Sequence, residues 1–158
     1  MSKLTIGDLV PSFSAASTKG IFNLKNHVGN YVVLYFYPKD NTPGCTKESQ
    51  DFATLYPEFL QQDAEIFGIS RDSMQSHINF KEKYNLPFAL LSDADQNICK
   101  LFDVLDETSS PNKDTCSMIR TTFLIDPDGK LVKEWRKVKV DGHAQEVLHF
   151  IAENNKHA

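Results

Sequence analysis

The sequence predicts an α/β fold, with a central mixed β-sheet flanked by helices and an N-terminal β-hairpin. Strand-like runs of β-branched and aromatic residues alternate with amphipathic helical segments, which is the pattern of an α/β protein. One hairpin signal stands near the start of the chain and a second stands late. No internal repeat, low-complexity tract or linker-like segment divides the 158 residues, so we expect a single domain over residues 1–158.

The first predicted elements are strands. Two short extended pieces, around Phe13 and over residues 21–24, flank the turn S-T-K-G that ends at Gly20. The run YVVLYFY at residues 31–37 is continuously β-branched and aromatic, which is typical of a central strand buried on both faces. Pro38 ends this strand, because proline cannot donate to a strand ladder.

Helices are predicted from the spacing of apolar residues. A first helix is expected over residues 42–60, where Pro57 predicts a kink or an early stop. A second helix is expected over residues 73–84, with Ile78 and Phe80 facing inward. The other predicted elements are strands at 64–70, 88–91, 121–126 and 130–135, and helices at 95–104 and 143–155.

The composition is that of a soluble globular protein, with 41% apolar and 24% charged residues. A net charge of −4 and a pI near 5.7 argue against a nucleic-acid partner, which needs a cationic face. The basic stretch KEWRKVK around Arg136 is interpreted as a solvated strand edge. No apolar window approaches the roughly 18 residues that a spanning helix needs, and no secretory signal is visible. We therefore expect no membrane partner and a cytoplasmic location.

The sequence predicts neither a metal nor a cofactor. The three cysteines and five histidines lack the spacing of a metal site or a disulfide framework. No Rossmann or Walker A pattern is present. His77 lies on the polar side of its predicted helix, so we expect it at the surface. Trp135 is expected to serve packing or edge structure.

The stretch Y-P-K-D-N-T-P-G-C-T-K-E at residues 37–48 places a cysteine at the start of a helix. Thr42 is a good N-cap residue and Pro43 is favoured at the first helical position, so Cys45 falls in the first turn. There, unpaired backbone N–H groups and the positive end of the helix dipole favour a thiolate. On these local features alone, a buried structural cysteine remains the alternative interpretation.

The magnitudes indicate that a helix start alone is not enough. A thiol with an ordinary pKa of about 8.5 is only a few per cent ionised at pH 7. Lowering such a pKa by ~2 units requires roughly 3 kcal/mol, whereas a helix terminus supplies ~0.3–2 kcal/mol. We therefore expect a nearby cation. Arg120, at the start of a predicted core strand, is the candidate, and Arg71, after the strand at 64–70, is the alternative.

Several motifs carry a family resemblance. The string P-x-x-x-T-x-x-C at residues 38–45 resembles the peroxiredoxin signature. The longer Y-F-Y-P-K-x-x-T-P-G-C-T-x-E at 35–48 is similar to the Q-type, or bacterioferritin-comigratory, branch. The likeness continues through G-I-S-R-D-S at 68–73, L-L-S-D at 90–93 and R-T-T-F-L-I-D-P-D-G at 120–129, so it covers nearly the whole chain.

The resemblance implies a thioredoxin-like fold and a thiol-dependent peroxidase, which reduces hydrogen peroxide and organic hydroperoxides in antioxidant defence. Cys45 would be the peroxidatic cysteine, oxidised to a sulfenic acid. Thr42 would hydrogen-bond the peroxide, Pro38 would shield the pocket from water, and Arg120 would polarise the peroxide and hold the thiolate. Glu48 matches an acidic position three residues after the nucleophile, where it would orient an arginine.

The chain departs from the family where resolving cysteines usually stand, since Gln50 and Lys81 occupy those positions. Cys99 is expected to serve packing and is the weaker candidate for an internal resolver. Cys116, in a polar loop that could be mobile and close to the pocket, is the better internal candidate, and a simple loop cysteine is the alternative interpretation. Two routes stay open. In the slightly favoured one-Cys route, thioredoxin, glutaredoxin or glutathione attacks the sulfenic acid directly. In the two-Cys route, Cys45 and Cys116 form a disulfide that thioredoxin reduces.

Two other functions can be weighed on the residues alone. A thiol–disulfide oxidoreductase of the same fold would need a C-x-x-C pair, and the stretch around Cys45 offers one thiol. A non-enzymatic thiol-bearing binding module would not depend on Cys45. A monomer and a weak homodimer both fit the sequence.

Overall fold

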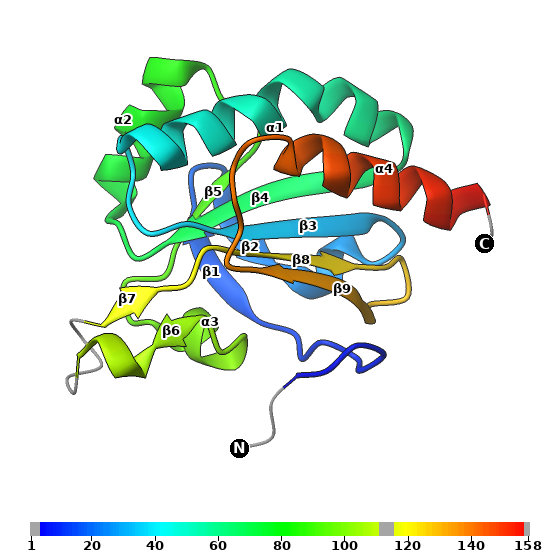
Figure 1. The fold of residues 1–158 in the computed structure, drawn as a ribbon, viewed down its shortest axis with the longest axis horizontal. Helices are drawn as coiled ribbons and strands as arrows, with labels where there is room; N and C mark the ends of the chain where they lie inside the picture. Colours follow the sequence, from blue (N-terminus) through cyan, green and yellow to red (C-terminus); the bar gives the residue numbers. More distant parts are fainter. Residues whose placement is uncertain (1–3, 111–115, 157–158) are drawn as a thin grey trace.

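The computed structural model describes residues 4–110 and 116–156. Within these residues the chain forms a seven-stranded mixed sheet, a separate two-stranded sheet and helices on both faces (Figure 1). The strands are β1 (Ser14–Ser17), β2 (Gly20–Asn23), β3 (Tyr31–Phe36), β4 (Ala64–Ser70), β5 (Leu90–Ser92), β6 (Leu105–Asp106), β7 (Ser117–Met118), β8 (Thr121–Ile125) and β9 (Leu131–Arg136). The helices are α1 (Pro43–Gln61), α2 (Met74–Tyr84), α3 (Asn97–Leu101) and α4 (His143–Lys156), with short 3-10 turns η1 (Leu24–His27) and η2 (Glu107–Ser109).

The large sheet has the order β2-β1-β5-β4-β3-β8-β9. Strand β4 lies parallel to both β3 and β5, whereas β3 and β8 are antiparallel. The β1–β2 hairpin forms one edge, and β9 pairs with β8 at the other. The predicted mixed sheet, the N-terminal hairpin and the edge position of the basic stretch are thereby confirmed. Because β3 and β4 are parallel, the loops that follow them meet at the same edge of the sheet.

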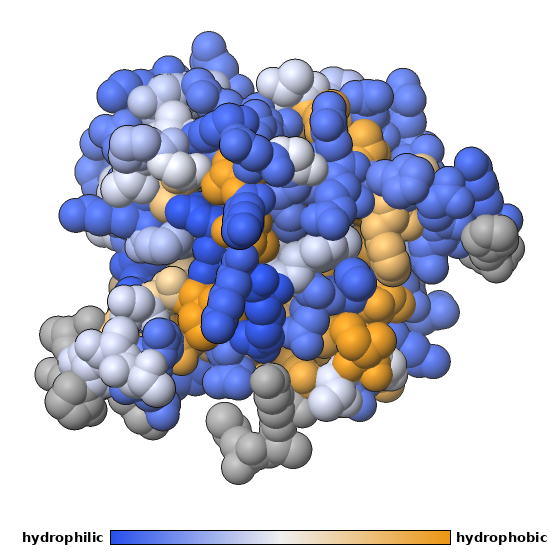
Figure 2. Space-filling view, in the orientation of Figure 1, coloured by the Kyte–Doolittle hydropathy of each residue, from blue (hydrophilic) through white to orange (hydrophobic). Residues whose placement is uncertain are grey.

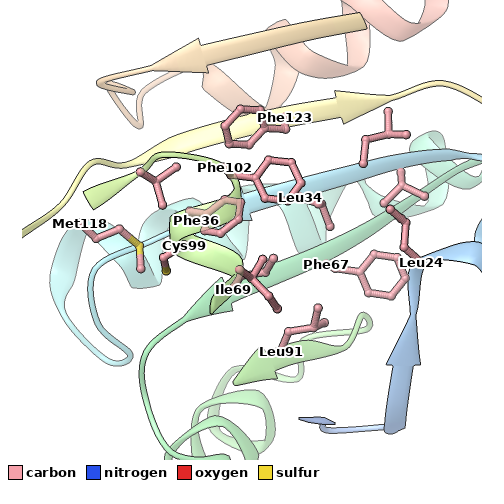
Figure 3. Close-up of a cluster of buried hydrophobic side chains, with 14 of the residues drawn as sticks. Leu24, Leu34, Phe36, Phe67, Ile69, Leu91, Cys99, Phe102, Met118 and Phe123 are labelled. Atoms are coloured by element: carbon pink, nitrogen blue, oxygen red, sulfur yellow. The ribbon is translucent and has the colours of Figure 1, made fainter. Parts of the chain in front are cut away.

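Side chains of β3 alternate between two apolar clusters, one on each face of the sheet. Leu34 and Phe36 lie in the first cluster, which α3 and the β6–β7 sheet close. Val33 and Tyr35 lie in the second cluster, which α1, α2 and α4 close. Figure 3 shows the first cluster, which also contains Cys99. All of β3 is buried, as predicted for a central strand.

Helix α1 begins at Pro43 and places Phe52 and Phe59 in the second cluster. Pro57 lies inside this helix, which continues past it, so the predicted early stop is wrong. A proline inside a helix costs about 3 kcal/mol. Complete burial of the two phenylalanine rings, worth roughly 1.5–3 kcal/mol each, offsets that cost.

Helix α2 is capped by Ser73, whose Oγ accepts the backbone N–H of Ser76 at 3.2 Å. His77 and Phe80 face the sheet and are 0% and 2% exposed, whereas Ile78 is 36% exposed. The inward position predicted for Phe80 is confirmed, and the inward Ile78 and the surface His77 are wrong. His77 and Phe80 are three residues apart and therefore lie on the same helix face. Ile78 follows His77 by one residue, so its side chain is rotated about 100° away from that of His77.

Helix α3 covers only Asn97–Leu101, so it is shorter than the predicted 95–104. Left-handed backbone bounds it on both sides, with φ of 65° at Gln96 and 55° at Asp103. A right-handed helix cannot continue through such residues. Strand β5 begins at Leu90 rather than at residue 88.

One face of the molecule, shown in Figure 2, is largely hydrophilic and carries separate apolar patches. Isolated apolar side chains of this kind are normal on a protein surface. Of the described helices, none combines the length and the apolar character that crossing a bilayer requires. The exposed large apolar side chains are Ile6, Leu9, Ile21, Val28, Leu60 and Ile78.

Candidate active site

Cys45 lies in the first turn of α1, where the loop from β3 enters the helix. The backbone of Thr42 is extended, with φ −91° and ψ 154°, and its carbonyl oxygen accepts the N–H of Thr46 at 2.8 Å. Thr42 is therefore the N-cap residue by position, and Cys45 is the third helical residue, as predicted. The side chain of Cys45 is 1% exposed and belongs to the second cluster. The thiol thus lies beneath the surface, beside the N–H groups of a helix start.

The hydroxyl of Thr42 does not cap the helix. Its Oγ1 donates to the carbonyl oxygen of Lys39 at 3.0 Å, and no side-chain cap to the helix is present in the described residues. Because its hydrogen is already donated, this hydroxyl oxygen can accept a hydrogen bond from a ligand. Pro38 stands exposed at the start of the same loop.

Arg120 immediately precedes β8 and reaches the cysteine from the neighbouring strand. Its Nη2 donates to Sγ of Cys45 at 3.2 Å, and its Nη1 donates to Oε1 of Glu48 at 2.6 Å. A Cβ added at Gly44 would lie 3.4 Å from Nη2, so the absence of a side chain there leaves room for the guanidinium. The cation predicted from the energy argument is therefore in contact with the sulfur.

Glu48 is the buried partner of Arg120, with a side chain that is 1% exposed. Burial raises the pKa of the Glu48 carboxyl from 4.5 to about 7, and the Arg120 guanidinium opposes this rise. Oε2 of Glu48 has no hydrogen-bond partner among the described residues. Burial therefore disfavours the charged form of this carboxyl, and the contact with Arg120 favours it.

Arg71, the alternative cation, lies elsewhere. Its Nη1 donates to the carbonyl oxygen of Cys116 at 2.9 Å and to Oε1 of Gln96 at 3.4 Å. The expectation that Arg71 could serve Cys45 is wrong, because this guanidinium contacts Gln96, just before α3, and Cys116, just before β7.

Cys99 and Cys116 are 0% and 1% exposed, and both belong to the first cluster, on the opposite face of the sheet from Cys45. All three cysteines are thiols. Burial, and then the neighbouring Asp93 carboxylate, raise the pKa of the Cys99 thiol well above its ordinary value. The predicted polar loop falls largely on residues 111–115, which lie outside the described residues. Cys116 itself is in the core rather than on a polar loop.

A second buried polar cluster, missed by sequence reasoning, joins the loop after β3 to α2. Nδ1 of His77 lies 2.7 Å from Oδ2 of Asp40, whose Oδ1 accepts the hydroxyl of Tyr37 at 2.6 Å. Burial raises the pKa of the Tyr37 phenol well above its ordinary value. The only sequence signal was the presence of titratable residues in two motif segments, and their spacing shows no periodicity that would join them.

The same cluster contains the one group in the described residues whose ligand atoms could surround a metal ion. Atoms of Asp40, Asp72 and His77 lie within 4.8 Å of one another. Each of them already takes part in a short hydrogen bond within the protein. The observed contacts are those of a hydrogen-bond network, and the donor set does not require an ion.

His143 is the first residue of α4. Its Nε2 is 2.8 Å from Oγ1 of Thr122, and its ring makes edge contacts with Phe52 and Trp135. Burial lowers the pKa of the His143 imidazole, and the nearby Arg120 acts in the same direction. The packing role predicted for Trp135 agrees with these contacts.

The site is therefore a cysteine at a helix start, in contact with an arginine–glutamate pair, on an α/β fold. A model of the AhpC/TSA family matches residues 6–134. The chain therefore belongs to the AhpC/TSA family, whose members are thiol peroxidases with a thioredoxin-like fold. Its curated relatives and structural neighbours place it with the Q-type, or bacterioferritin-comigratory, peroxiredoxins.

Two curated relatives illustrate the match. Peroxiredoxin Bcp of Xanthomonas campestris is 50% identical over 125 residues, which cover 79% of this chain and 78% of the relative. Peroxiredoxin Bcp of Bacillus subtilis is 44% identical over 149 residues, which cover 94% of this chain and 95% of the relative.

Solved structures agree with the fold. Peroxiredoxin Q of Xanthomonas campestris gives a TM-score of 0.86 at 43% identity and covers 95% of this chain and 96% of its own. PrxQ of Xylella fastidiosa gives a TM-score of 0.89 at 38% identity and covers 98% of this chain and 99% of its own. A bacterioferritin comigratory protein of Xanthomonas campestris, described for alkyl peroxide reduction, gives a TM-score of 0.87 at 42% identity. It covers 96% of this chain and 97% of its own.

Proposed function

We propose that Cys45 is the peroxidatic cysteine of this thiol-dependent peroxidase, which reduces hydrogen peroxide and organic hydroperoxides. One observation carries the assignment: the Arg120 guanidinium lies 3.2 Å from Sγ of Cys45 at the first turn of a helix. A positive charge at that distance stabilises a sulfur anion, and the helix start adds to the effect. The alkyl peroxide reduction described for the Xanthomonas campestris relative supports organic hydroperoxides as substrates.

The reaction is an in-line displacement at oxygen. The Cys45 thiolate attacks the terminal oxygen of R–O–O–H, an S–O bond forms, and the O–O bond breaks. The products are the sulfenic acid of Cys45 and an alkoxide, which takes a proton from solvent to become the alcohol. Negative charge moves from sulfur to the leaving oxygen, so donors fixed beside both atoms lower the barrier.

We assign the remaining roles from position. The hydroxyl of Thr42, whose hydrogen is donated to Lys39, accepts the O–H of the peroxide. Pro38, exposed on the same loop, shields the pocket mouth from water. Arg120 holds the thiolate and polarises the peroxide. Glu48 acts in support by holding Nη1 of Arg120 at 2.6 Å, which aims Nη2 at the sulfur.

For recycling we propose the one-Cys route, in which an external thiol such as thioredoxin, glutaredoxin or glutathione attacks the sulfenic acid. That attack forms a mixed disulfide and releases water, and a second thiol then reduces the disulfide. The core positions of Cys99 and Cys116, on the face of the sheet opposite Cys45, support this route. The two-Cys route would need Cys116 to leave its cluster.

Peptide mass spectrometry after one equivalent of peroxide separates the two routes. The one-Cys route predicts a trapped sulfenic acid at Cys45 with Cys99 and Cys116 both alkylatable after unfolding. A Cys45–Cys116 crosslink would overturn it in favour of an internal resolver.

We place the enzyme in the cytoplasm, because all three cysteines are thiols and such residues persist in reducing compartments. It acts as a monomer or a weak homodimer, without a nucleic-acid or membrane partner. Sedimentation across a hundredfold concentration range tests the assembly state.

The decisive test of the assignment is hydroperoxide consumption with dithiothreitol as the reductant. Cys45→Ser is expected to lower the rate to that of the buffer, because the attacking sulfur is gone. Cys99→Ala is the matched control, since its thiol is equally buried in the other cluster, and it is expected to keep the rate within about twofold. Full activity in Cys45→Ser would contradict the proposal.

A further inference from the structure

We propose that His77 and Asp40 form a buried, proton-sharing pair that positions the loop 38–42, and with it Thr42, for reaction with peroxide. This inference rests on the proposed function, because its readout is the reaction of Cys45. Neither residue touches the reacting atoms, so both are positioning residues. The pair lies outside the Arg120–Glu48 contact, and its Asp40 precedes Thr42 in the chain, whereas Glu48 follows Thr42.

The two side chains are buried in the protein. His77 is 0% exposed and Asp40 is 6% exposed. Nδ1 of His77 meets Oδ2 of Asp40 at 2.7 Å, and Nε2 of His77 meets the carbonyl oxygen of Leu91 at 2.8 Å. The imidazole therefore connects the loop after β3 to strand β5.

Donor and acceptor chemistry defines the protons of the pair. A carbonyl oxygen can only accept, so Nε2 of His77 carries a hydrogen toward Leu91. The short contact between Nδ1 and the Asp40 carboxyl then holds one further proton, shared by an imidazole and a carboxylate. Ser76 donates its hydroxyl to Oδ2 of Asp40 at 2.8 Å, and Tyr37 donates to Oδ1 at 2.6 Å. Three side chains therefore contact the Asp40 carboxyl group: Tyr37 at Oδ1, and Ser76 and His77 at Oδ2.

The backbone of the loop is tied down as well. The N–H of Asp40 donates to Oδ2 of Asp72 at 2.8 Å, which joins it to the loop after β4. Asn41 has a left-handed φ of 63°, and its Oδ1 accepts from Nζ of Lys83 and the hydroxyl of Tyr84 at 3.3 and 3.2 Å. The middle of the loop is thus held from α2 and from the loop after β4.

These contacts matter for Thr42 because it is only two residues from Asp40. The direction of its hydroxyl is set by a hydrogen bond back to Lys39, within the same loop. A displacement of about 1 Å at a reacting group can cost 10²-fold in rate. If Asp40 loses its hydrogen bond to His77, we expect the loop to shift. The Thr42 hydroxyl, which accepts from the peroxide, would shift with it.

A matched pair of substitutions tests the proposal. The amide nitrogen of Asn stands where Nδ1 of histidine stands, whereas that of Gln stands near Nε2. His77→Asn therefore keeps a donor for Asp40, and His77→Gln keeps only the donor for Leu91. Two rates are measured for each variant: the reaction of Cys45 with hydrogen peroxide, and its alkylation by iodoacetamide.

We expect His77→Gln to slow the peroxide reaction about 30-fold and His77→Asn less than about fivefold. Alkylation of Cys45, which does not need Thr42, is expected to stay within about twofold in both. Equal peroxide rates in the two variants, or a parallel loss of alkylation, would overturn the proposal. If wild type itself shows no fast peroxide reaction, the proposed function fails, which is a different result.

A milder variant covers the case in which a His77 substitution unfolds the protein. Ser76→Ala removes one of the three donors to Asp40 and leaves His77 in place. We expect a three- to fivefold slower peroxide reaction at unchanged alkylation, against no change for Gln75→Ala. Gln75 is exposed on the same helix, and its amide contacts Asn79 instead. An unchanged peroxide rate in Ser76→Ala would also overturn the proposal.

Discussion

The buried carboxyl of Glu48 makes a quantitative prediction about stability. In the unfolded chain this group has a pKa near 4.5, and burial raises it to about 7 in the fold. The unfolded state therefore loses its proton first, and the fold loses stability as the pH rises from 4.5 through 7. A pKa difference of about two to three units corresponds to about 3 kcal/mol, most of which accrues between pH 5 and pH 8.5.

The perturbation is Glu48→Gln, which has nearly the shape of the protonated acid and does not titrate. Urea unfolding with a phosphine reductant is measured for both proteins at pH 5 and pH 8.5. We expect the variant to gain about 2–3 kcal/mol on wild type between the two pH values, which shifts the urea midpoint by about 1 M. Glu58→Gln, exposed on the same helix, is the matched control and is expected to show no such gain.

The same substitution is expected to slow the peroxide reaction, because Arg120 loses the carboxylate that holds its Nη1. A substitution that stabilises the fold and lowers activity is expected at a functional carboxylate whose burial is unfavourable. The reasoning is refuted if the stability difference between wild type and Glu48→Gln does not change with pH, or changes in the opposite sense.

Three further outcomes are expected. Arg120→Lys should lower the peroxide rate constant by about 10²- to 10³-fold in stopped-flow assays, because the single ammonium nitrogen cannot occupy both positions from which Nη1 and Nη2 contact Glu48 and Cys45. Gly68→Ala should destabilise the fold by about 1–3 kcal/mol in urea unfolding, since its Cβ would lie 2.8 Å from the Tyr35 ring. Burial lowers the pKa of His143, so wild type should lose stability as the pH falls below 6.5. His143→Gln should flatten that acid limb, as followed by thermal melts at pH 5 and 7.

The parts of the site that sequence could predict are local ones. Pro43 and Cys45 stand two residues apart, and the rules for helix starts act over that distance. The strand at residues 31–37 was predictable because its own side chains are continuously apolar. Both inferences need no information from the rest of the chain.

The choice between Arg120 and Arg71 could not be made in that way. Each arginine stands beside a predicted strand, and both are cations. What decides is the antiparallel register of β3 and β8, in which Phe36 lies opposite Thr121 and brings Arg120 to the loop after β3. A pairing between residues this far apart in the chain is a property of the assembled sheet, and local patterns do not encode it.

His77 was placed wrongly for a related reason. A hydrophobicity pattern treats imidazole as a polar side chain and assigns it to solvent, so the apolar Ile78 took the inward place. The buried position is stable because a carboxylate and a carbonyl oxygen satisfy both ring nitrogens. Those partners come from the loop after β3 and from β5, so the cost of burial could be judged only once the fold was known.

The three cysteines show that burial alone does not decide which thiol is reactive. Cys45 and Cys99 are 1% and 0% exposed, so their degrees of burial are nearly the same. The neighbouring charge has the opposite sign: a guanidinium lies 3.2 Å from the sulfur of Cys45, whereas the Asp93 carboxylate faces Cys99. In a medium of low dielectric, a cation stabilises a sulfur anion and a carboxylate destabilises it. The sign of the adjacent charge therefore supports our proposal that Cys45 is the nucleophile and Cys99 is a packing residue.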